Sequence, residues 1–313
     1  MRILVTGGAG FIASHVAEAF VLAGHEVLVV DNLSTGRRKN LPPGADFAEM
    51  SINDEAFAGL VRDFSPEVID HHAAQMDVRR SVQDPIFDAT ENVLGSLRLM
   101  IAAVSAGVRK IVYASTGGAT YGDVSQIPVS ESLLPNPVCQ YGVSKHTVEH
   151  YLFVYKRLYG LDYTVLRYPN VYGPRQNPQG EAGVVAIFAG QMLRGERPTV
   201  FGDGSKSRDY VHVRDIARAN LLALDAGSGC VLNLGSGRET TDREVFDAVA
   251  AAVGYEDEPE YAQVRPGEVY RICLDASSAA ERLGWVPSIE FRAGAYETVK
   301  WIDANRDYLE ERP

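Results

Sequence analysis

The stretch of residues 140–152, QYGVSKHTVEHYL, contains two sets of side chains suited to different chemistry. Tyr141 and Lys145 are four residues apart, so they share one face if the stretch is helical. A phenol beside an ammonium is suited to taking a proton, because the positive charge stabilises the phenolate and lowers its pKa from about 10. One residue on, the string from His146 to His150 matches the H-x-x-E-H zinc site of one class of peptidases.

The zinc site has little further support in the sequence. On a helical wheel His146 and His150 lie about 40° apart and point toward one ion, but Arg157 shares their face and opposes a dication. No third ligand is evident. The neighbouring pair His71 and His72 ends a predicted strand, where adjacent side chains point to opposite faces. We therefore predict no metal site and place the two helical histidines on the back of the Tyr-Lys helix.

A glycine-rich turn near the start of the chain predicts a dinucleotide site. The residues TGGAGFIA at 6–13 follow a short apolar strand and open a helix. Gly7 suits a tight turn, and Gly10 lets the backbone approach a pyrophosphate at the helix N-terminus. Asp31 ends the second strand, where a carboxylate accepts hydrogen bonds from both ribose hydroxyls and repels a 2′-phosphate. We therefore predict NAD rather than NADP as the cofactor.

The elements that must position these residues alternate through the first half of the chain. Predicted strands cover residues 3–5, 26–30, 68–69, 110–113 and 163–167, and predicted helices cover 14–23 and 96–104. Short apolar runs separated by helices are typical of a parallel sheet buried on both faces. We predict an α/β, Rossmann-type doubly wound sheet over residues 1–168. A smaller α/β substrate lobe, rich in glycine and proline, is predicted over 169–313, with some segments returning to the first domain.

Composition restricts the partners and the location. The chain has 313 residues, 46% of them apolar, and a net charge of −11, which argues against binding to nucleic acid. The three cysteines lack paired spacing, the N-terminus enters a strand without a leader, and no apolar run reaches the roughly 18 residues of a membrane span. We expect a cytoplasmic protein with no membrane partner. The segment 96–104 is apolar nearly all round, so we expect it to contribute to a homodimer contact.

Motifs spread over essentially the whole chain carry a family resemblance. They are GGAGFI at 7–12, DNLSTG at 31–36, HAAQ at 72–75, Tyr141 with Lys145, RYPNVYGPR at 167–175, GDG at 202–204, RDYVH at 208–212 and RPGE at 265–268. With these motifs the chain resembles the extended short-chain dehydrogenase/reductases of the NAD-dependent epimerase/dehydratase family. Within that family it is most similar to the UDP-glucose 4-epimerases.

The resemblance implies roles for the matching residues. The implied catalytic residues are Tyr141, Lys145 and Thr116. The implied NAD-binding residues are Gly7, Gly10, Phe11, Ile12, Asp31, Asn32, Ser51, Ile52, Ala73, Ala74, Gln75, Asn92, Ser115, Tyr141, Lys145 and Tyr168. A UDP-hexose would contact Thr116, Gly117, Tyr141, Asn170, Thr199, Val200, Phe201, Arg208, Arg265 and Ile272. An acidic protein that binds a diphosphate needs local guanidinium groups, and Arg208 and Arg265 are the candidates.

The sequence departs from the family pattern at two positions. Relatives carry a catalytic Ser or Thr four residues before the tyrosine of a Tyr-Gly pair, but Gly117 stands there, so we predict Thr116 as the hydroxyl partner. Ser51 stands where relatives usually have an aspartate near the adenine. Arg37 and Arg38 are the one feature that favours NADP, and we expect both on a solvated loop.

The loop that contains Thr116 also discriminates among reactions. Sugar 4,6-dehydratases need an Asp-Glu pair there and related decarboxylases a glutamate, whereas this chain has Gly117 and Gly118. Oxidation and re-reduction need only Tyr141, a hydroxyl and NAD. We therefore predict C4 epimerisation of UDP-glucose and UDP-galactose. Ile272 leaves UDP-N-acetylglucosamine and uronic or pentose nucleotide-sugars open, and a non-catalytic NAD-binding sensor on the same fold is the alternative from another class.

Overall fold

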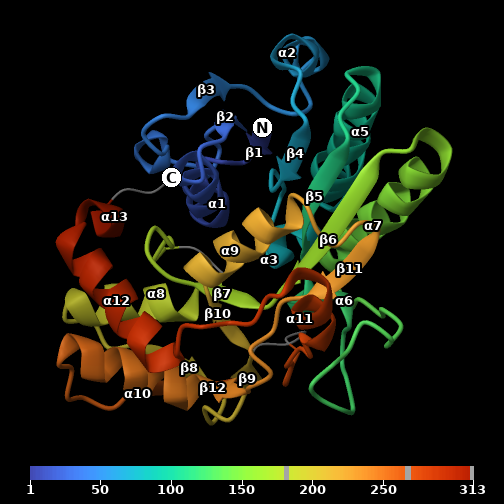
Figure 1. Cartoon of the computed structure of the whole chain (residues 1–313). Helices are drawn as coiled ribbons and strands as arrows, with labels where there is room; N and C mark the ends of the chain where they lie inside the picture. Colours follow the sequence, from blue (N-terminus) through green and yellow to red (C-terminus); the bar gives the residue numbers. More distant parts are fainter. Residues whose placement is uncertain (180–182, 265–268, 311–313) are drawn as a thin grey trace.

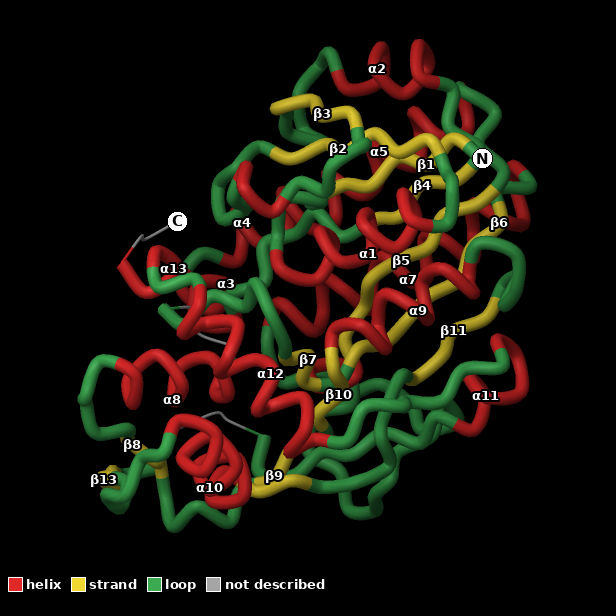
Figure 2. Tube along the Cα trace, turned by 60° about the vertical axis from the view of Figure 1, so that its left-hand side comes forward, coloured by secondary structure: helices red, strands yellow, loops and turns green. Residues whose placement is uncertain are grey.

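The computed structural model describes residues 1–179, 183–264 and 269–310 of the chain. Figure 1 shows a large sheet flanked by helices in the N-terminal part of the chain and a smaller lobe below it, built around α8, α10 and α12. The tube in Figure 2 shows the strands of the large sheet running side by side with helices on both of its faces. No helix in the described ranges is long and apolar enough to cross a membrane.

The large sheet is parallel throughout, with the strand order β11-β6-β5-β4-β1-β2-β3. This is the doubly wound, Rossmann-type order that the sequence predicted, with one strand added beyond β6. Each predicted strand is confirmed and is longer than predicted. The strands are β1 (Arg2–Thr6), β2 (Glu26–Asp31), β3 (Asp46–Glu49), β4 (Val68–His71), β5 (Lys110–Thr116), β6 (Asp162–Tyr168) and β11 (Cys230–Asn233).

Two apolar cores lie on the two faces of this sheet. Ile3 and Val5 point into a core with α1 (Phe11–Leu22) and α9 (Val213–Ala223), while Leu4 between them points into a core with α2 (Phe57–Phe64), α5 (Gly95–Ser105) and α7 (Gln140–Tyr159). All three side chains are fully buried. The period-2 alternation of a strand therefore explains why the sequence shows continuous apolar runs here.

The catalytic motif lies at the start of α7, the longest helix. This helix ends at Gly160, which takes a left-handed conformation with φ of 74°, and Lys156 and Arg157 stand in its last turn, where cations suit the helix dipole. The predicted helix at 96–104 is confirmed as α5. The predicted helix at 14–23 is α1, which begins earlier because Gly10 already takes the extended N-cap conformation.

Segments after residue 168 contribute to both lobes. β11 pairs with β6 in the large sheet, and α9 packs on α1. The smaller lobe has its own apolar core among α8 (Val184–Leu193), α10 (Asp242–Val253) and α12 (Phe291–Ala304). Its strand pairs are β7 (Asn170–Tyr172) with β10 (Tyr210–His212), β8 (Thr199–Phe201) with β13 (Glu260–Ala262), and β9 (Ser207–Arg208) with β12 (Thr240–Thr241).

The remaining helices are short. They are η1 (Arg38–Asn40), α3 (Val78–Gln83), α4 (Pro85–Ala89), the π-helix η2 (Thr90–Leu94), α6 (Gly117–Thr120), α11 (Ser277–Leu283) and α13 (Asp307–Glu310). Of these, α6 directly follows β5 and so begins at the carboxyl edge of the large sheet, which is where ligands bind in open α/β folds.

Candidate active site

The glycine-rich turn between β1 and α1 is packed too closely for side chains at its glycines. Gly7 has a φ of +71°, and a Cβ there would lie 2.8 Å from the backbone nitrogen of Ala73. A Cβ on Gly10 would lie 3.0 Å from the carbonyl oxygen of Gly7, and no side chain caps the helix at Gly10. Phe11 and Ile12 form the first turn of α1. The backbone can therefore bring a pyrophosphate to the positive end of this helix.

Asp31 lies at the end of β2, beside the glycine-rich turn. Its Oδ1 accepts a hydrogen bond from the Leu33 nitrogen (2.8 Å) and its Oδ2 one from the Ala9 nitrogen (3.0 Å). Burial raises the pKa of this carboxyl, and the two hydrogen bonds oppose that rise. A Cβ on Gly36 would lie 2.8 Å from Oδ1, so the glycine keeps space open beside the carboxylate. These contacts fit a dinucleotide ribose, with exposed Asn32 next in the chain.

The two arginines that favoured NADP contact protein groups instead. Arg38 pairs with Glu49 and lies 4.8 Å from the centroid of the Phe47 ring. The guanidinium of Arg37 lies 4.3 Å from the centroid of the Tyr308 ring and is half-buried, so the expectation that both lie on a solvated loop is wrong for Arg37. This arrangement favours NAD, because a 2′-phosphate would have to displace these contacts.

Four further residues predicted to bind the cofactor follow β3 and β4. The Ser51 hydroxyl accepts a hydrogen bond from the Asn53 nitrogen (3.1 Å). Ile52 is 5% exposed and packs against α5, where a Cβ on Gly95 would lie 2.9 Å from its Cδ1. Ala73 and Ala74 follow β4, and the Ala73 nitrogen donates to the Thr6 hydroxyl (3.1 Å).

A buried polar cluster joins the cofactor edge to α7. The Asn92 Oδ1 accepts from the Gln75 nitrogen (2.8 Å), and its Nδ2 donates to the Gln75 carbonyl (2.9 Å), to Asp88 Oδ1 (3.1 Å) and to Ser144 Oγ (3.1 Å). Asn92 lies on the π-helix η2, a rare element that is frequent at functional sites. Its amide thus positions Gln75 and the catalytic helix. Sequence reasoning missed Asp88, which is 1% exposed and shows no motif.

Tyr141 and Lys145 lie on the same face of α7, as their spacing predicted. The Tyr141 nitrogen donates to the Ser81 hydroxyl (3.2 Å), which ties the start of α7 to α3. Lys145 is 4% exposed, and its ammonium lies 4.6 Å from the centroid of the Tyr113 ring. The pair therefore lies in a desolvated site at the carboxyl end of β5.

Burial dominates the proton affinities of this pair. It lowers the pKa of the Lys145 ammonium to about 7, although the carboxylates of Asp88 and Glu149 act in the opposite direction. Burial raises the pKa of the Tyr141 phenol, and the neighbouring Cys139 thiol and Asp88 carboxylate add to the rise. Desolvation thus raises the phenol pKa in the protein alone, and the expected lowering depends on the positive nicotinamide ring as well as on Lys145.

Thr116 and Asn170 face the same space from two strands. Thr116 ends β5 and caps α6, and its Oγ1 accepts from the Ala119 nitrogen (3.2 Å). A Cβ on Gly118 would lie 3.9 Å from both Thr116 Oγ1 and Asn170 Oδ1 and would meet nothing closer. The hydroxyl and the amide therefore converge over Gly118, where a larger side chain would occupy the space between them.

Gly117 departs from the family pattern for a packing reason. A Cβ at this position would lie 2.3 Å from Cδ1 of Leu274, which is fully buried. A serine here would require Leu274 to move, so the hydroxyl function has to come from a neighbouring position.

We expect Gly117→Ala to lower the free energy of unfolding by about 1–3 kcal/mol, as overpacking typically does. Urea unfolding followed by circular dichroism measures this change. Gly118→Ala is the matched control, because its Cβ meets open space, and its effect should stay within about 0.5 kcal/mol. Equal stability of the two variants would contradict this account of Gly117.

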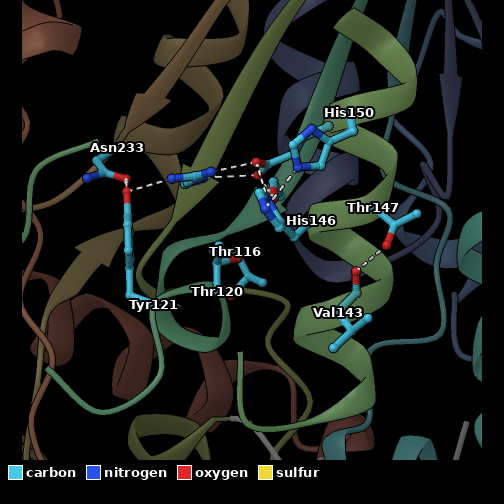
Figure 3. Close-up of polar contacts among 11 residues, drawn as sticks. Thr116, Thr120, Tyr121, Val143, His146, Thr147, His150 and Asn233 are labelled. Atoms are coloured by element: carbon cyan, nitrogen blue, oxygen red, sulfur yellow. Dashed lines mark hydrogen bonds and ion pairs between the residues drawn. The ribbon is translucent and has the colours of Figure 1, made fainter. Parts of the chain in front are cut away.

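A buried ion pair between Glu149 and Arg167 lies behind residues 115–121, which are called the catalytic loop below (Figure 3). Glu149 Oε1 accepts from Ser115 Oγ (2.6 Å) and from Arg167 Nε (3.0 Å), and Oε2 accepts from Arg167 Nη2 (2.5 Å). Arg167 Nη1 donates to the Tyr121 hydroxyl (2.7 Å), which donates to Asn233 Oδ1 (2.9 Å). Ser115, predicted to bind the cofactor, thus points its hydroxyl into this network. Sequence reasoning missed the Glu149–Arg167 ion pair, because its two residues lie on different elements, α7 and β6.

The H-x-x-E-H string takes part in the same network. His146 Nδ1 lies 3.0 Å from Glu149 Oε2, and Nε2 of His150 lies 3.1 Å from Nε2 of His146. Figure 3 shows the two imidazoles next to each other, on the side of α7 that faces the contacts leading to Tyr121 and Asn233. In the part of the chain that the structure describes, no three His, Cys, Asp or Glu residues are grouped to hold a metal. Glu149 of this string instead forms an ion pair with Arg167.

The other adjacent histidines point to opposite faces of the large sheet. His71 contacts the hydroxyls of Thr6 (2.8 Å) and Ser96 (2.9 Å), and His72 Nε2 lies 3.0 Å from the Tyr168 hydroxyl. The Tyr168 hydroxyl also pairs with the Asn220 side chain, so its polar end is held by protein groups rather than turned outward.

The predicted nucleotide-sugar residues lie on short strands of the smaller lobe. Thr199 and Phe201 lie on one face of β8, while Val200 between them is 1% exposed and belongs to the lobe's core, so its side chain is turned away from them. Arg208 Nη1 on β9 donates to the carbonyls of Ser207 (2.9 Å) and Tyr270 (3.2 Å).

The two remaining predicted substrate residues are Ile272 and Arg265. Ile272 is 2% exposed and packs with Tyr121, Val129 and Leu274, in the cluster that supports the catalytic loop. Arg265, predicted on the diphosphate, lies outside the described residues.

Similarity to known proteins shows which family this chain belongs to. Residues 3–235 match the model of the NAD dependent epimerase/dehydratase family, and the chain belongs to this family. Among solved structures it is similar to the UDP-glucose 4-epimerase of Thermotoga maritima with UDP-glucose, at 47% identity and a TM-score of 0.95, covering 98% of this chain and 100% of that one. It is also similar to the Thermus thermophilus UDP-glucose 4-epimerase in complex with NAD, at 45% identity and a TM-score of 0.91, covering 96% and 98%. The UDP-glucose 4-epimerase of Mycolicibacterium smegmatis is 47% identical over 308 residues, which cover 96% of this chain and 98% of that protein.

Proposed function

We propose that this protein is a UDP-glucose 4-epimerase that interconverts UDP-glucose and UDP-galactose with NAD as its cofactor. The observation that carries the proposal is the combination of near full-length similarity to enzymes of that name with a Tyr141–Lys145 pair at the carboxyl edge of the large sheet. The cofactor fits this chain because the Gly7 and Gly10 positions leave no room for a Cβ and Asp31 is held beside them.

The chemistry needs one base, one hydroxyl and a hydride acceptor. NAD, when bound, supplies the acceptor and later the donor of the C4 hydride, together with the positive charge that the Tyr141 phenol needs to ionise. Tyr141 then takes the proton of the C4 hydroxyl and returns it at the end of the reaction. Thr116 holds the C4 oxygen by a hydrogen bond. Lys145 places its amine next to the nicotinamide ribose, in a site from which water is largely excluded.

The loop after β5 favours epimerisation over elimination. Gly117 and Gly118 bring no acid or base to the substrate, so loss of water across C5–C6 has no proton donor or acceptor there. The small residues also leave open space beside Thr116 and Asn170. A 4-keto sugar must turn between oxidation and reduction, and such space permits the turn.

The smaller lobe is proposed to hold the nucleotide end of the substrate. We assign Arg208 and Arg265 to the diphosphate, Asn170 to the region next to it, and the segment 199–201 to the uracil. Firm binding of the nucleotide lets the sugar itself stay loosely held. The division at residue 168 thus separates the cofactor-binding part from the substrate lobe, apart from α9 and β11.

We further propose a homodimer through α5 and α7, and a cytoplasmic location. The two helices pack side by side and present large apolar side chains outward: Ile101 is 57% exposed, Val143 50% and Leu158 67%. Several large apolar side chains exposed on two packed helices favour an interaction site there. The free thiols of the three cysteines suit a reducing compartment.

The direct test is to incubate the purified protein with UDP-glucose, without added NAD, and follow UDP-galactose by chromatography. We expect conversion in both directions toward one equilibrium ratio. UDP-N-acetylglucosamine and uronic or pentose nucleotide-sugars are assayed in parallel. If the protein converts one of these parallel substrates but not UDP-glucose, that nucleotide-sugar becomes the assigned substrate. Bound NAD without conversion of any sugar would support the sensor alternative.

A further inference from the structure

We propose that Tyr308, in the C-terminal helix α13, is a positioning residue that clamps the loop beside the cofactor site and thereby slows NAD release. The clamped segment, residues 36–40, is called the ribose loop below because it begins next to the Asp31 carboxylate. The inference deepens the proposed function, since it rests on NAD binding at Asp31 and the glycine-rich turn. Neither the family motifs nor the catalytic residues involve α13.

The ribose loop lies directly on the glycine-rich turn. The Arg37 nitrogen donates to the carbonyl oxygen of Ala9 (2.9 Å), and the Asn40 side-chain amide donates to the same oxygen (2.8 Å). Gly36 approaches both the Asp31 carboxylate and the Ala9 side chain so closely that a Cβ would lie within 2.9 Å of each. Any outward movement of this loop therefore disturbs the groups that hold the adenosine ribose.

Tyr308 holds the ribose loop from the outside. Its hydroxyl donates to the Asn40 Oδ1, whose amide nitrogen makes the bond to Ala9. The guanidinium carbon of Arg37 lies 4.3 Å, and the Lys39 ammonium 4.0 Å, from the centroid of its ring. Tyr308 is 4% exposed and Arg37 is half-buried, so the Arg37 contact is partly desolvated and stronger than on an open surface, whereas Lys39 is exposed. One aromatic side chain thus contacts three residues of the loop.

The opposite side of α13 is anchored in the smaller lobe. The Tyr308 ring packs edge-on against Trp301 of α12, with centroids 4.6 Å apart. Leu309 is 6% exposed in the core of that lobe, and its carbonyl accepts from the Gln179 side chain (2.7 Å). Lys39 also pairs with Asp307, at the start of α13. Figure 1 shows α13 at the end of α12, beside the segment that follows β2.

The clamp suits an enzyme whose cofactor must stay bound through both half-reactions. If NADH left while the sugar was oxidised, the hydride would be lost and the keto sugar released. Opening the ribose loop requires the Tyr308–Asn40 hydrogen bond and two cation–π contacts to break together. Release of the cofactor is therefore expected to depend on α13, although α13 lies outside the dinucleotide-binding motif.

The test uses the full chain loaded with NADH, with no UDP-sugar present. Release is followed by the loss of enzyme-bound NADH fluorescence after dilution into excess NAD. We expect Tyr308→Ala to accelerate release about tenfold or more, and Tyr308→Phe, which loses only the hydrogen bond, about threefold. The matched control is Tyr296→Ala. This tyrosine on α12 is 53% exposed, and the Lys300 ammonium lies 5.4 Å from its ring centroid, but within the described part of the chain it makes no contact with the ribose loop. Its release rate should equal that of the wild type.

Two results separate a clamp from a merely structural side chain. Release from Tyr308→Ala at the wild-type rate would overturn the proposal, even if its melting temperature fell. If Tyr308→Ala does not fold, Tyr308→Phe decides the question, because wild-type release from that variant would overturn the role of the hydroxyl–Asn40 bond. The readout is independent of epimerase turnover. Faster release from a protein that converts no sugar would therefore sustain the clamp while the proposed function fails.

Discussion

Replacement of Tyr141 by phenylalanine is expected to lower the epimerase kcat by about 10²- to 10⁴-fold, the usual contribution of a positioned general acid–base group. The phenol is the proposed base on this face of α7, whereas the Lys145 ammonium lies 4.6 Å from the centroid of the Tyr113 ring. Phenylalanine keeps the ring and its packing, so NAD content and stability should not change. A coupled assay of UDP-galactose conversion gives kcat, and absorbance after denaturation gives the NAD content.

Tyr151→Phe is the control for this experiment. Tyr151 lies on the same helix, ten residues after Tyr141, and is 37% exposed, so the turnover of this variant should match the wild type. If Tyr141→Phe retained near-full turnover with NAD bound, Tyr141 would not be the base, and the proposed mechanism would have to be abandoned.

Replacement of Glu149 by glutamine is expected to lower the free energy of unfolding by about 3–5 kcal/mol, as breaking a buried ion pair does. The glutamine removes the charge that faces Arg167, whose side chain is only 5% exposed. The guanidinium then stays buried without a counter-ion. Epimerase activity should also fall, because Ser115 precedes Thr116 and loses a charged acceptor.

The pH dependence gives an independent measurement of the same pair. Burial would raise the pKa of Glu149, but hydrogen bonds from His146 and Arg167 outweigh it and lower the pKa to about 2, from 4.5. A carboxyl whose pKa is depressed on folding contributes stability above its unfolded pKa and loses it as pH falls through the folded value. The stability difference between wild type and Glu149→Gln should therefore be full at pH 6 and shrink between pH 4.5 and about 2.

Glu196→Gln is the matched control for the ion pair. Glu196 also pairs with an arginine, Arg194, but its side chain is 52% exposed, so the change should cost less than about 1 kcal/mol at pH 6. Urea unfolding of the three proteins at pH 6 and pH 3 provides the comparison. An equal cost for Glu149→Gln and Glu196→Gln would show that the buried pair makes no special contribution.

The amino-acid sequence by itself determined the features that depend on local rules. The positive φ at Gly7, the alternation of short apolar runs with helices, and the four-residue spacing of Tyr141 and Lys145 each follow from backbone conformation and element period. Those features were enough to predict the doubly wound sheet and the base on its helix, and to place Asp31 at the end of the second strand. The edge strands β3 and β11 were missed, because β3 (DFAE) begins and ends with a charged residue and β11 (CVLN) is a four-residue strand within a glycine-rich segment.

Only the tertiary structure decided the features that join distant parts of the chain. Gly117 is a glycine because Leu274 fills the space beside it, Glu149 is neutralised by Arg167 on a neighbouring strand, and Tyr308 reaches back to Asn40. The pKa values of the catalytic pair likewise depend on burial, which no spacing reveals. Sequence periodicity reports which face a residue occupies, whereas the partner across that face is set by how the elements pack.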